Sequence, residues 1–304
     1  MRIEKFTVVS DYDQAELSAV AYIPETPKGI FQIVHGMCEY KARYEPFMQF
    51  MAGQGYIAVV HDHRGHGESV KSDDDLGFFG DKTGEAIVED AAKVTREVKA
   101  KFGDLPVILF GHSMGSLVVR CYIQKYDDTI DKLIVCGSPS RNPLVGVAIG
   151  LAKTIGKCKG ERHRSNTLKQ LSTGKGDKNF KGEGEGAWLT RDRETVHRYA
   201  ADPKCGYTFT ANGYLNLFRL LKNTYDGGRY ALKNKTLPIF FVAGSDDPII
   251  VSEEKWAKAQ AFLRELGYEN VSGKLFHQMR HEVLNEIGKE EVYAAILAFA
   301  EEGN

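Results

Sequence analysis

The stretch "PVILFGHSMGSLVV", residues 106–119, decides the fold of this chain. An apolar run typical of a buried strand ends in Gly-His-Ser-Met-Gly, and a second apolar stretch follows at once. A sharp turn from strand into helix leaves no room for Cβ atoms two positions on either side of the turn residue, and Gly111 and Gly115 lack those atoms. We therefore predict that Ser113 lies above the carboxyl edge of a sheet as a nucleophile. The alternative is a serine that caps the following helix.

A serine hydroxyl attacks efficiently only when a base removes its proton and a third group orients that base. After such a turn the partners follow in the order serine, acid, histidine, each behind a later strand. "FFVAGSDDPII", residues 240–250, supplies the acid. We favour Asp247, which stands three positions after the glycine and just before the proline, and Asp246 is the alternative.

The histidine comes from "KLFHQMRHEVLNE", residues 274–286. His277 is expected to belong still to the last strand, where a packed or hydrogen-bonded histidine is ordinary. His281 falls in the loop behind that strand and before the final helical segment. The order rule therefore favours His281 as the base.

A tetrahedral intermediate at the serine needs two hydrogen-bond donors. One is the backbone amide of Met114, at the amino end of the expected helix, where negative charge is stabilised. The other must come from an earlier loop, and "IVHGMCEY", residues 33–40, places the amide of Met37 directly behind a strand. We predict these two amides as the oxyanion hole. A plain strand-to-helix turn is the alternative for the glycine before Met37.

Short apolar runs alternate with amphipathic segments from residue 29 to residue 139. This order predicts an α/β fold with a mostly parallel sheet and helices on both faces. Residues 5–10 and 16–24 are expected to form a hairpin at the sheet edge. The alternation lapses near residue 140 and returns after residue 235. We therefore divide the chain into a core, residues 1–139 and 236–304, and an inserted cap, residues 140–235.

The cap begins with the apolar stretch "PLVGVAIGLAKTIG" and continues into a basic tract, residues 153–181, with nine Lys or Arg against two acids. An apolar helix here faces an acyl chain or a bilayer, or it packs on the edge of the sheet. The basic tract docks on anionic lipid headgroups, each cation contributing on the order of 1 kcal/mol, or it is a solvated loop. Both pairs of interpretations stay open, so transient contact with a membrane surface is one expectation.

The composition excludes several other classes of protein. With 304 residues and a formal net charge of −1, the chain shows no basic module for nucleic acid. We expect no secretory leader, since residues 1–14 have no sustained apolar core, and no apolar run is long enough for a membrane span. Its five cysteines are scattered without a metal or dithiol spacing, as free thiols in a reducing compartment would be. We expect a cytoplasmic protein, with peripheral attachment to the membrane as the alternative.

Three histidines lie close together in "HDHRGHGES": His61, His63 and His66. No carboxylate or thiolate at a matching spacing completes a metal site, so we expect none. Asp62 is expected to order this loop beneath the active site.

Five stretches carry a resemblance to a known family: "HGMCEYKARY", "DHRGHGES", "GHSMGS", "GSDDP" and "RHEVLNE", between residues 35 and 287. With them the chain resembles the α/β-hydrolase superfamily, and more narrowly the monoacylglycerol lipase/lysophospholipase family. The resemblance implies an eight-stranded, mostly parallel sheet with an inserted cap. It also implies a Ser113–Asp247–His281 triad, an oxyanion hole from Met37 and Met114, and hydrolysis of a single-chain lipid ester without metal or organic cofactor.

One segment departs from that family, whose members usually carry Gly-Glu-His after the oxyanion residue. This chain has Cys38-Glu39-Tyr40, which leaves a backbone donor unaffected. Glu39 and Arg43 are candidates to bind hydroxyls of a substrate head group. An internal Glu39–Arg43 ion pair at i,i+4 spacing is at least as strongly indicated.

Three other functions are weighed against a lipid-ester hydrolase. A general short-chain carboxylesterase uses the same triad on smaller substrates. A peptidase of the proline-iminopeptidase type shares the triad, but it needs an acidic site for a free amino terminus. A catalytically silent binding scaffold usually lacks a triad member, and none is missing here.

Overall fold

The computed structural model describes residues 1–174 and 176–303. Within that part of the chain, eight strands form one sheet in the order β1-β2-β4-β3-β5-β6-β7-β8. The strand β2 is antiparallel to β1 and β4, and the other neighbours are parallel. The strands are β1 Arg2–Val9, β2 Glu16–Ile23, β3 Gly29–Val34, β4 Tyr56–His61, β5 Val107–His112, β6 Lys132–Cys136, β7 Ile239–Gly244 and β8 Val271–Phe276. The predicted mostly parallel sheet and its edge hairpin are confirmed.

Helices cover both faces of this sheet. The core helices are α1 Glu45–Gly53, α2 Ala86–Phe102, α3 Met114–Tyr126, α8 Glu253–Leu266 and α9 Lys289–Glu301. Short 3₁₀ turns are η1 Lys41–Tyr44, η2 Asp73–Asp75, η3 Gly176–Asn179, η4 Gly227–Arg229 and η5 Val283–Asn285. Helices α2, α3 and α8 pack in one apolar cluster, and α1 and α9 pack in a second. No helix in residues 1–174 and 176–303 combines the length and apolar character needed to cross a bilayer.

The central strands read as continuous apolar runs because both of their faces are buried. Every residue of β3 is buried. Ile30 and Val34 join the cluster with α2 and α3, whereas Phe31 and Ile33 join the cluster with α1 and α9. This alternation follows from the two-residue period of a strand.

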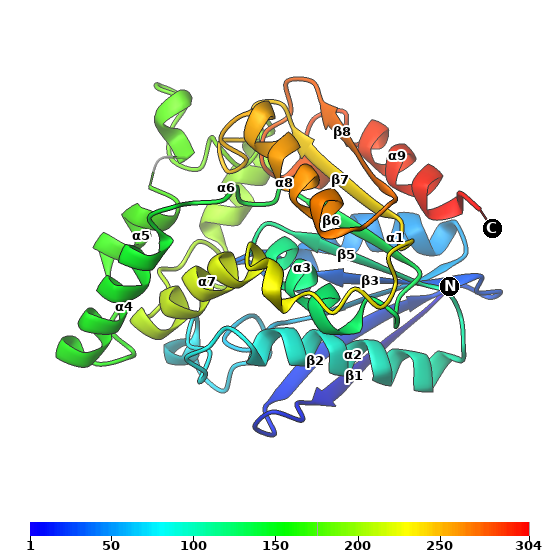
Figure 1. Ribbon diagram of the computed structural model, residues 1–304, viewed down its shortest axis with the longest axis horizontal. Helices are drawn as coiled ribbons and strands as arrows, with labels where there is room; N and C mark the ends of the chain where they lie inside the picture. Colours follow the sequence, from blue (N-terminus) through cyan, green and yellow to red (C-terminus); the bar gives the residue numbers. More distant parts are fainter. Residues whose placement is uncertain (175, 304) are drawn as a thin grey trace.

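Helices α4 Val145–Lys159, α5 Asn166–Ser172, α6 Arg193–Ala201 and α7 Ala211–Thr224 lie between β6 and β7, in the segment predicted as the cap. Figure 1 shows α4, α5 and α7 grouped at one end of the molecule, opposite the two termini. Helix α4 packs on α7, and α7 packs on the core helix α3. The cap is thereby attached to the helix that begins at the predicted nucleophile.

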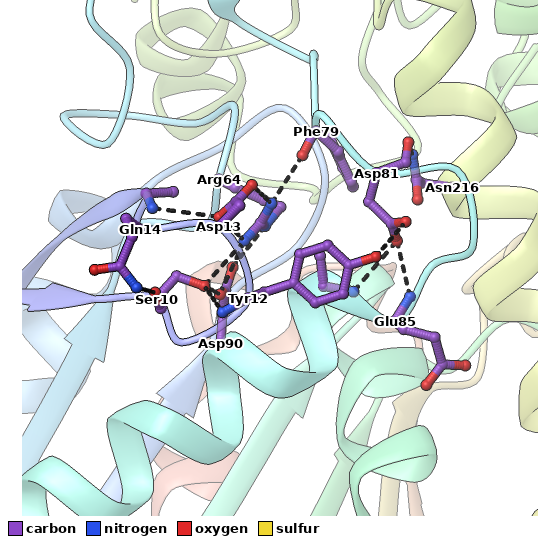
Figure 2. Close-up of polar contacts among 12 residues, drawn as sticks. Ser10, Tyr12, Asp13, Gln14, Arg64, Phe79, Asp81, Glu85, Asp90 and Asn216 are labelled. Atoms are coloured by element: carbon purple, nitrogen blue, oxygen red, sulfur yellow. Dashed lines mark hydrogen bonds and ion pairs between the residues drawn. The ribbon is translucent and has the colours of Figure 1, made fainter.

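A buried network of ion pairs and hydrogen bonds also connects cap and core (Figure 2). Arg64 donates from Nε to Asp90 at 2.6 Å and from Nη1 to Asp13 at 2.8 Å, which joins the loop after β4 to α2 and to the edge hairpin. The Asp81 carboxylate accepts from amides at the start of α2. The Asp81 carbonyl accepts from Asn216 Nδ2 at 2.8 Å, and Asn216 belongs to α7.

Candidate active site

The turn between β5 and α3 has the expected strand–turn–helix form. Ser113 lies between the two elements with φ 54° and ψ −117°, a conformation that an L residue rarely adopts. A Cβ atom on Gly115 would lie 2.0 Å from the carbonyl oxygen of Val34, and one on Gly111 would lie 2.4 Å from the carbonyl oxygen of Gly115. The Ser113 side chain makes no capping hydrogen bond to α3, so the helix-cap alternative is not what the structure shows.

The acid and the histidine meet behind β7 and β8. His281 Nδ1 lies 2.9 Å from Asp247 Oδ2, and both side chains are almost fully buried. Asp247 Oδ1 accepts from the amide of Ile249 at 2.8 Å, which fixes the carboxylate. Asp246 is exposed and its carboxylate accepts from Ser245. The structure thus brings Asp247, and not Asp246, to the histidine, and a proton on Nδ1 leaves Nε2 as the basic nitrogen.

His281 lies close in space to the turn between β5 and α3. His112, the residue before Ser113, has its Nε2 3.2 Å from the carbonyl oxygen of His281, and the two imidazole rings are 4.7 Å apart. The amide of Ser113 donates to the carbonyl of Cys136 at 2.9 Å. Gly137 follows Cys136 in the chain, and a Cβ atom on it would lie 3.2 Å from the His281 ring.

The prediction that His277 belongs to the last strand is wrong by one residue. Strand β8 ends at Phe276, because the chain turns there and the amide of Met279 donates back to the carbonyl of Phe276 at 3.3 Å. His277 is exposed in this turn.

Ser113 opens into a cavity of about 570 Å³ between the core and the cap. Met37 and Met114, the predicted oxyanion residues, line it beside the serine. A Cβ atom on Gly36 would lie 3.2 Å from Ser113 Cβ, so the turn that carries Met37 lies against the serine. Most of the remaining lining residues are apolar, and helices α3, α4, α5 and α7 contribute Leu117, Val145, Leu171, Leu217, Phe218 and Leu221.

Glu39 and Arg43 do not line that cavity. They form the ion pair predicted as the alternative, with Arg43 Nη1 2.6 Å from Glu39 Oε2. Arg43 also donates twice to Glu282, at 2.6 and 2.7 Å. The two side chains border a separate space of about 10 Å³, which is too small for a substrate head group.

Glu39 connects three parts of the site. Its Oε1 accepts from the amide of Gly36 at 2.6 Å and from the Tyr44 hydroxyl at 2.8 Å, and lies 3.3 Å from His112 Nδ1. Burial opposes the charge on Glu39, but His112 and Arg43 outweigh burial and lower the pKa of this carboxyl. Burial likewise opposes the charge on His112, but Glu39 outweighs it and raises the pKa of the imidazole.

Sequence reasoning missed three members of this network: Tyr44, His112 and Glu282. A usable signal existed, because His112 and Glu282 directly adjoin the predicted Ser113 and His281. A polar residue beside a catalytic one lies near the same edge of the sheet and is available to orient it.

The histidine-rich segment at the end of β4 packs against the turn after β3 that carries Met37. The imidazoles of His61, His63 and His66 are fully buried, as is that of His35. Asp62 accepts from the amide of Lys41 and from its ammonium group, at 2.7 and 2.5 Å, consistent with the ordering role predicted for it. Within residues 1–174 and 176–303, no group of three or more His, Cys, Asp or Glu side chains is arranged to hold a metal ion.

The chain is similar to known proteins in sequence and in structure. Residues 25–288 match the family described as serine aminopeptidase, S33. A monoacylglycerol lipase of Mycolicibacterium smegmatis is 27% identical over 269 residues, which cover 87% of this chain and 85% of the relative. The phospholipase YtpA of Bacillus subtilis is 24% identical over 281 residues, with 91% and 97% covered. The crystal structure of a highly thermostable carboxyl esterase from Bacillus coagulans has a TM-score of 0.90 at 24% identity, with 99% and 98% covered. This likeness confirms the predicted α/β-hydrolase fold.

Proposed function

The chain belongs to the serine aminopeptidase S33 family, and we propose that it hydrolyses carboxylic esters of single-chain lipids through an acyl-Ser113 intermediate. One observation carries the proposal: the strained Ser113 turn opens into a mainly apolar cavity of about 570 Å³, and the Asp247–His281 pair lies close to that turn, with the His281 ring 4.7 Å from the ring of His112. A cavity of this size suits a small organic ligand.

In the proposed reaction these groups act in turn. Ser113 Oγ attacks the ester carbonyl carbon while His281 Nε2 takes the hydroxyl proton, and Asp247 holds the imidazole and stabilises its positive charge. The amides of Met37 and Met114 donate to the oxyanion. The tetrahedral intermediate breaks its bond to the alcohol oxygen, which leaves with the proton from His281. Water, activated by the same imidazole, then releases the carboxylic acid and restores Ser113.

The lining of the cavity supports an acyl chain as the group bound beside Ser113. Its walls are mainly Leu, Val, Ile, Phe and Pro side chains. Two relatives are named a monoacylglycerol lipase and a phospholipase, and a structural neighbour is named a carboxyl esterase. No Asp or Glu is among the described residues that line the cavity, so nothing there would hold the free amino terminus that a proline iminopeptidase binds. The short-chain carboxylesterase remains the second candidate.

The test compares the wild type with Ser113→Ala and with Ser272→Ala, which changes an exposed serine of β8. We expect Ser113→Ala to lose about 10⁴- to 10⁶-fold in kcat on a nitrophenyl ester, with an unchanged circular dichroism spectrum, and to resist fluorophosphonate labelling. Ser272→Ala should match the wild type. Undiminished hydrolysis by Ser113→Ala would overturn the proposal. A panel of monoacylglycerols, lysophospholipids and short esters decides the substrate class, and preference for the short esters would favour the carboxylesterase.

We also propose that the substrate enters from a lipid surface. Leu144, Val147, Leu171 and Val251 border the cavity, and each is more than half exposed. The basic tract of residues 153–181 follows the first two of them in the chain, although Lys175 within it lies outside the described residues. Co-sedimentation with phosphatidylcholine vesicles, with and without anionic lipid, tests the proposal.

In that assay Val147→Asp should reduce vesicle binding, because it places a charge in the apolar rim. Ile3→Asp is the control, since Ile3 is also an exposed hydrophobic residue but lies on the edge strand β1, away from the cavity. Equal binding by both variants and the wild type would contradict a lipid-facing rim without affecting the assignment of Ser113.

A further inference from the structure

A cap residue, Trp188, touches both the cavity and the predicted base. Its side chain lines the cavity together with Ser113. Its indole packs against the imidazole of His281 in a tilted arrangement, with ring centroids 5.0 Å apart and planes inclined by 34°. The backbones of the two segments are also hydrogen-bonded to each other. The amide of His281 donates to the Trp188 carbonyl at 3.3 Å, and the amide of Glu282 donates to the Leu189 carbonyl at 2.7 Å.

Both sides of Trp188 are held in place. On the cap side, the Asp177 carboxylate accepts from the amide of Trp188 at 3.0 Å, and a Cβ atom on Gly176 would lie 2.7 Å from the indole. On the core side, Arg280 donates to the Ala187 carbonyl at 2.7 Å. The indole is therefore held against His281 from two sides, by the cap and by the loop that carries Arg280 and His281.

Several charged and titratable groups surround His281 and Trp188, among them Arg280, which precedes His281 in the chain, and Asp177, which accepts from the Trp188 amide. Asp247 lies at Nδ1 and the His112 ring lies 4.7 Å away. Behind His112 lies Glu39, and Glu282 directs its carboxylate to Arg43. Unlike these groups, the indole of Trp188 carries no charge, and it also lines the cavity beside Ser113.

We propose that Trp188 is a positioning residue for the base: its indole orients the His281 ring and stabilises the imidazolium that forms when Ser113 loses its proton. The proposal rests on the proposed function, in which that proton transfer occurs. The face of an indole carries partial negative charge and attracts a cation stacked on it. An alkyl chain in the cavity contacts this same indole, so the cap couples substrate binding to the orientation of the base.

Kinetics test this role through the pH profile. Trp188→Leu keeps an apolar side chain but removes the π face. We expect kcat to fall about 2- to 30-fold and the acid limb of the kcat/KM profile to move down by about 0.4–1.5 pH units, since the imidazolium loses a contact of that strength. Trp188→Phe, which keeps a weaker π face, should recover most of both. A change confined to KM, with the pH profile unmoved in both variants, would overturn the proposal.

Fluorescence tests the contact independently of turnover. The chain has two tryptophans, so Trp256→Phe leaves Trp188 as the sole indole emitter. A protonated imidazole in contact with an indole quenches its emission, and we expect a pH titration of Trp188 fluorescence that His281→Gln abolishes. The titration should persist in Ser113→Ala, so it stands even if no ester is hydrolysed. A titration unchanged by His281→Gln would refute the pairing.

Discussion

Acidification from pH 7.5 to 5.5 should remove a large part of the stability of this protein, because four histidines are buried as neutral rings. His35, His61, His63 and His66 have no exposed surface. Burial lowers the pKa of His61 to about 3 and that of His66 to about 4, and it places the pKa values of His35 and His63 well below the ordinary value. The hydrogen bonds agree: His35 Nδ1 donates to the Gly36 carbonyl, and His35 Nε2 accepts from the amide of His63 at 3.0 Å.

The sign follows from proton uptake by the unfolded chain. Unfolded histidines bind protons below about pH 6.5, whereas these folded ones stay neutral until far lower pH, so the free energy of unfolding falls as the pH falls through this window. Each ring contributes a loss of about 1.3 kcal/mol between pH 7.5 and 5.5, and the four together contribute about 5 kcal/mol. His112 acts in the opposite direction. Its raised pKa provides stability that is complete below about pH 6.5 and lost as the pH rises through the folded value, which offsets part of the fall.

Urea unfolding followed by far-ultraviolet circular dichroism at the two pH values measures this loss. We expect the wild type to lose up to about 5 kcal/mol, against a total stability of about 5–15 kcal/mol for an ordinary domain. His61→Leu removes a ring whose two nitrogens have no hydrogen-bond partner among the described residues, and its loss should be smaller by about 1.3 kcal/mol. His197→Gln changes an exposed histidine of α6 and should behave as the wild type. If His61→Leu loses as much stability as the wild type, buried neutral imidazoles do not explain the acid sensitivity.

Three further substitutions test the site. Gly115→Ala places a Cβ atom 2.0 Å from the carbonyl oxygen of Val34, which ends β3. It should lower the free energy of unfolding by at least about 3 kcal/mol in thermal unfolding and abolish fluorophosphonate labelling. Its control, Gly53→Ala, has open space around the new Cβ atom and should be neutral or stabilising by up to about 1 kcal/mol. Arg43→Met leaves two buried carboxylates without their shared cation and should cost about 3–5 kcal/mol in urea unfolding, against less than about 0.5 kcal/mol for Arg198→Met in an exposed pair. Asp247→Asn should lower kcat on a nitrophenyl ester about 10⁴-fold with the fold retained, and a smaller loss than tenfold would contradict its role.

The local pattern of the sequence was sufficient for the fold and for the elements that carry the proposed triad. The glycines around Ser113 predict a turn that a Cβ atom would block, and the contacts of Gly111 and Gly115 show why. The spacing behind β7 selects Asp247, and the hydrogen bond to His281 agrees. The two-residue period of a strand and the steric limits of a turn act over a few residues, so both can be recognised in the sequence alone.

The surroundings of those residues were decided by the tertiary structure alone. Arg43 pairs with Glu282 across 239 positions, and Glu39 meets His112 across 73. The sequence left open whether Glu39 and Arg43 bind substrate or each other. The two side chains are buried together because the turn that carries Met37 and Glu39 packs against the loop that carries His281 and Glu282. Nothing in the sequence around Trp188 predicted its contact with His281, because that contact depends on how the cap segment packs against the loop after β8. Long-range ion pairs and ring contacts have no period along the chain, so only the folded chain determines which residues meet.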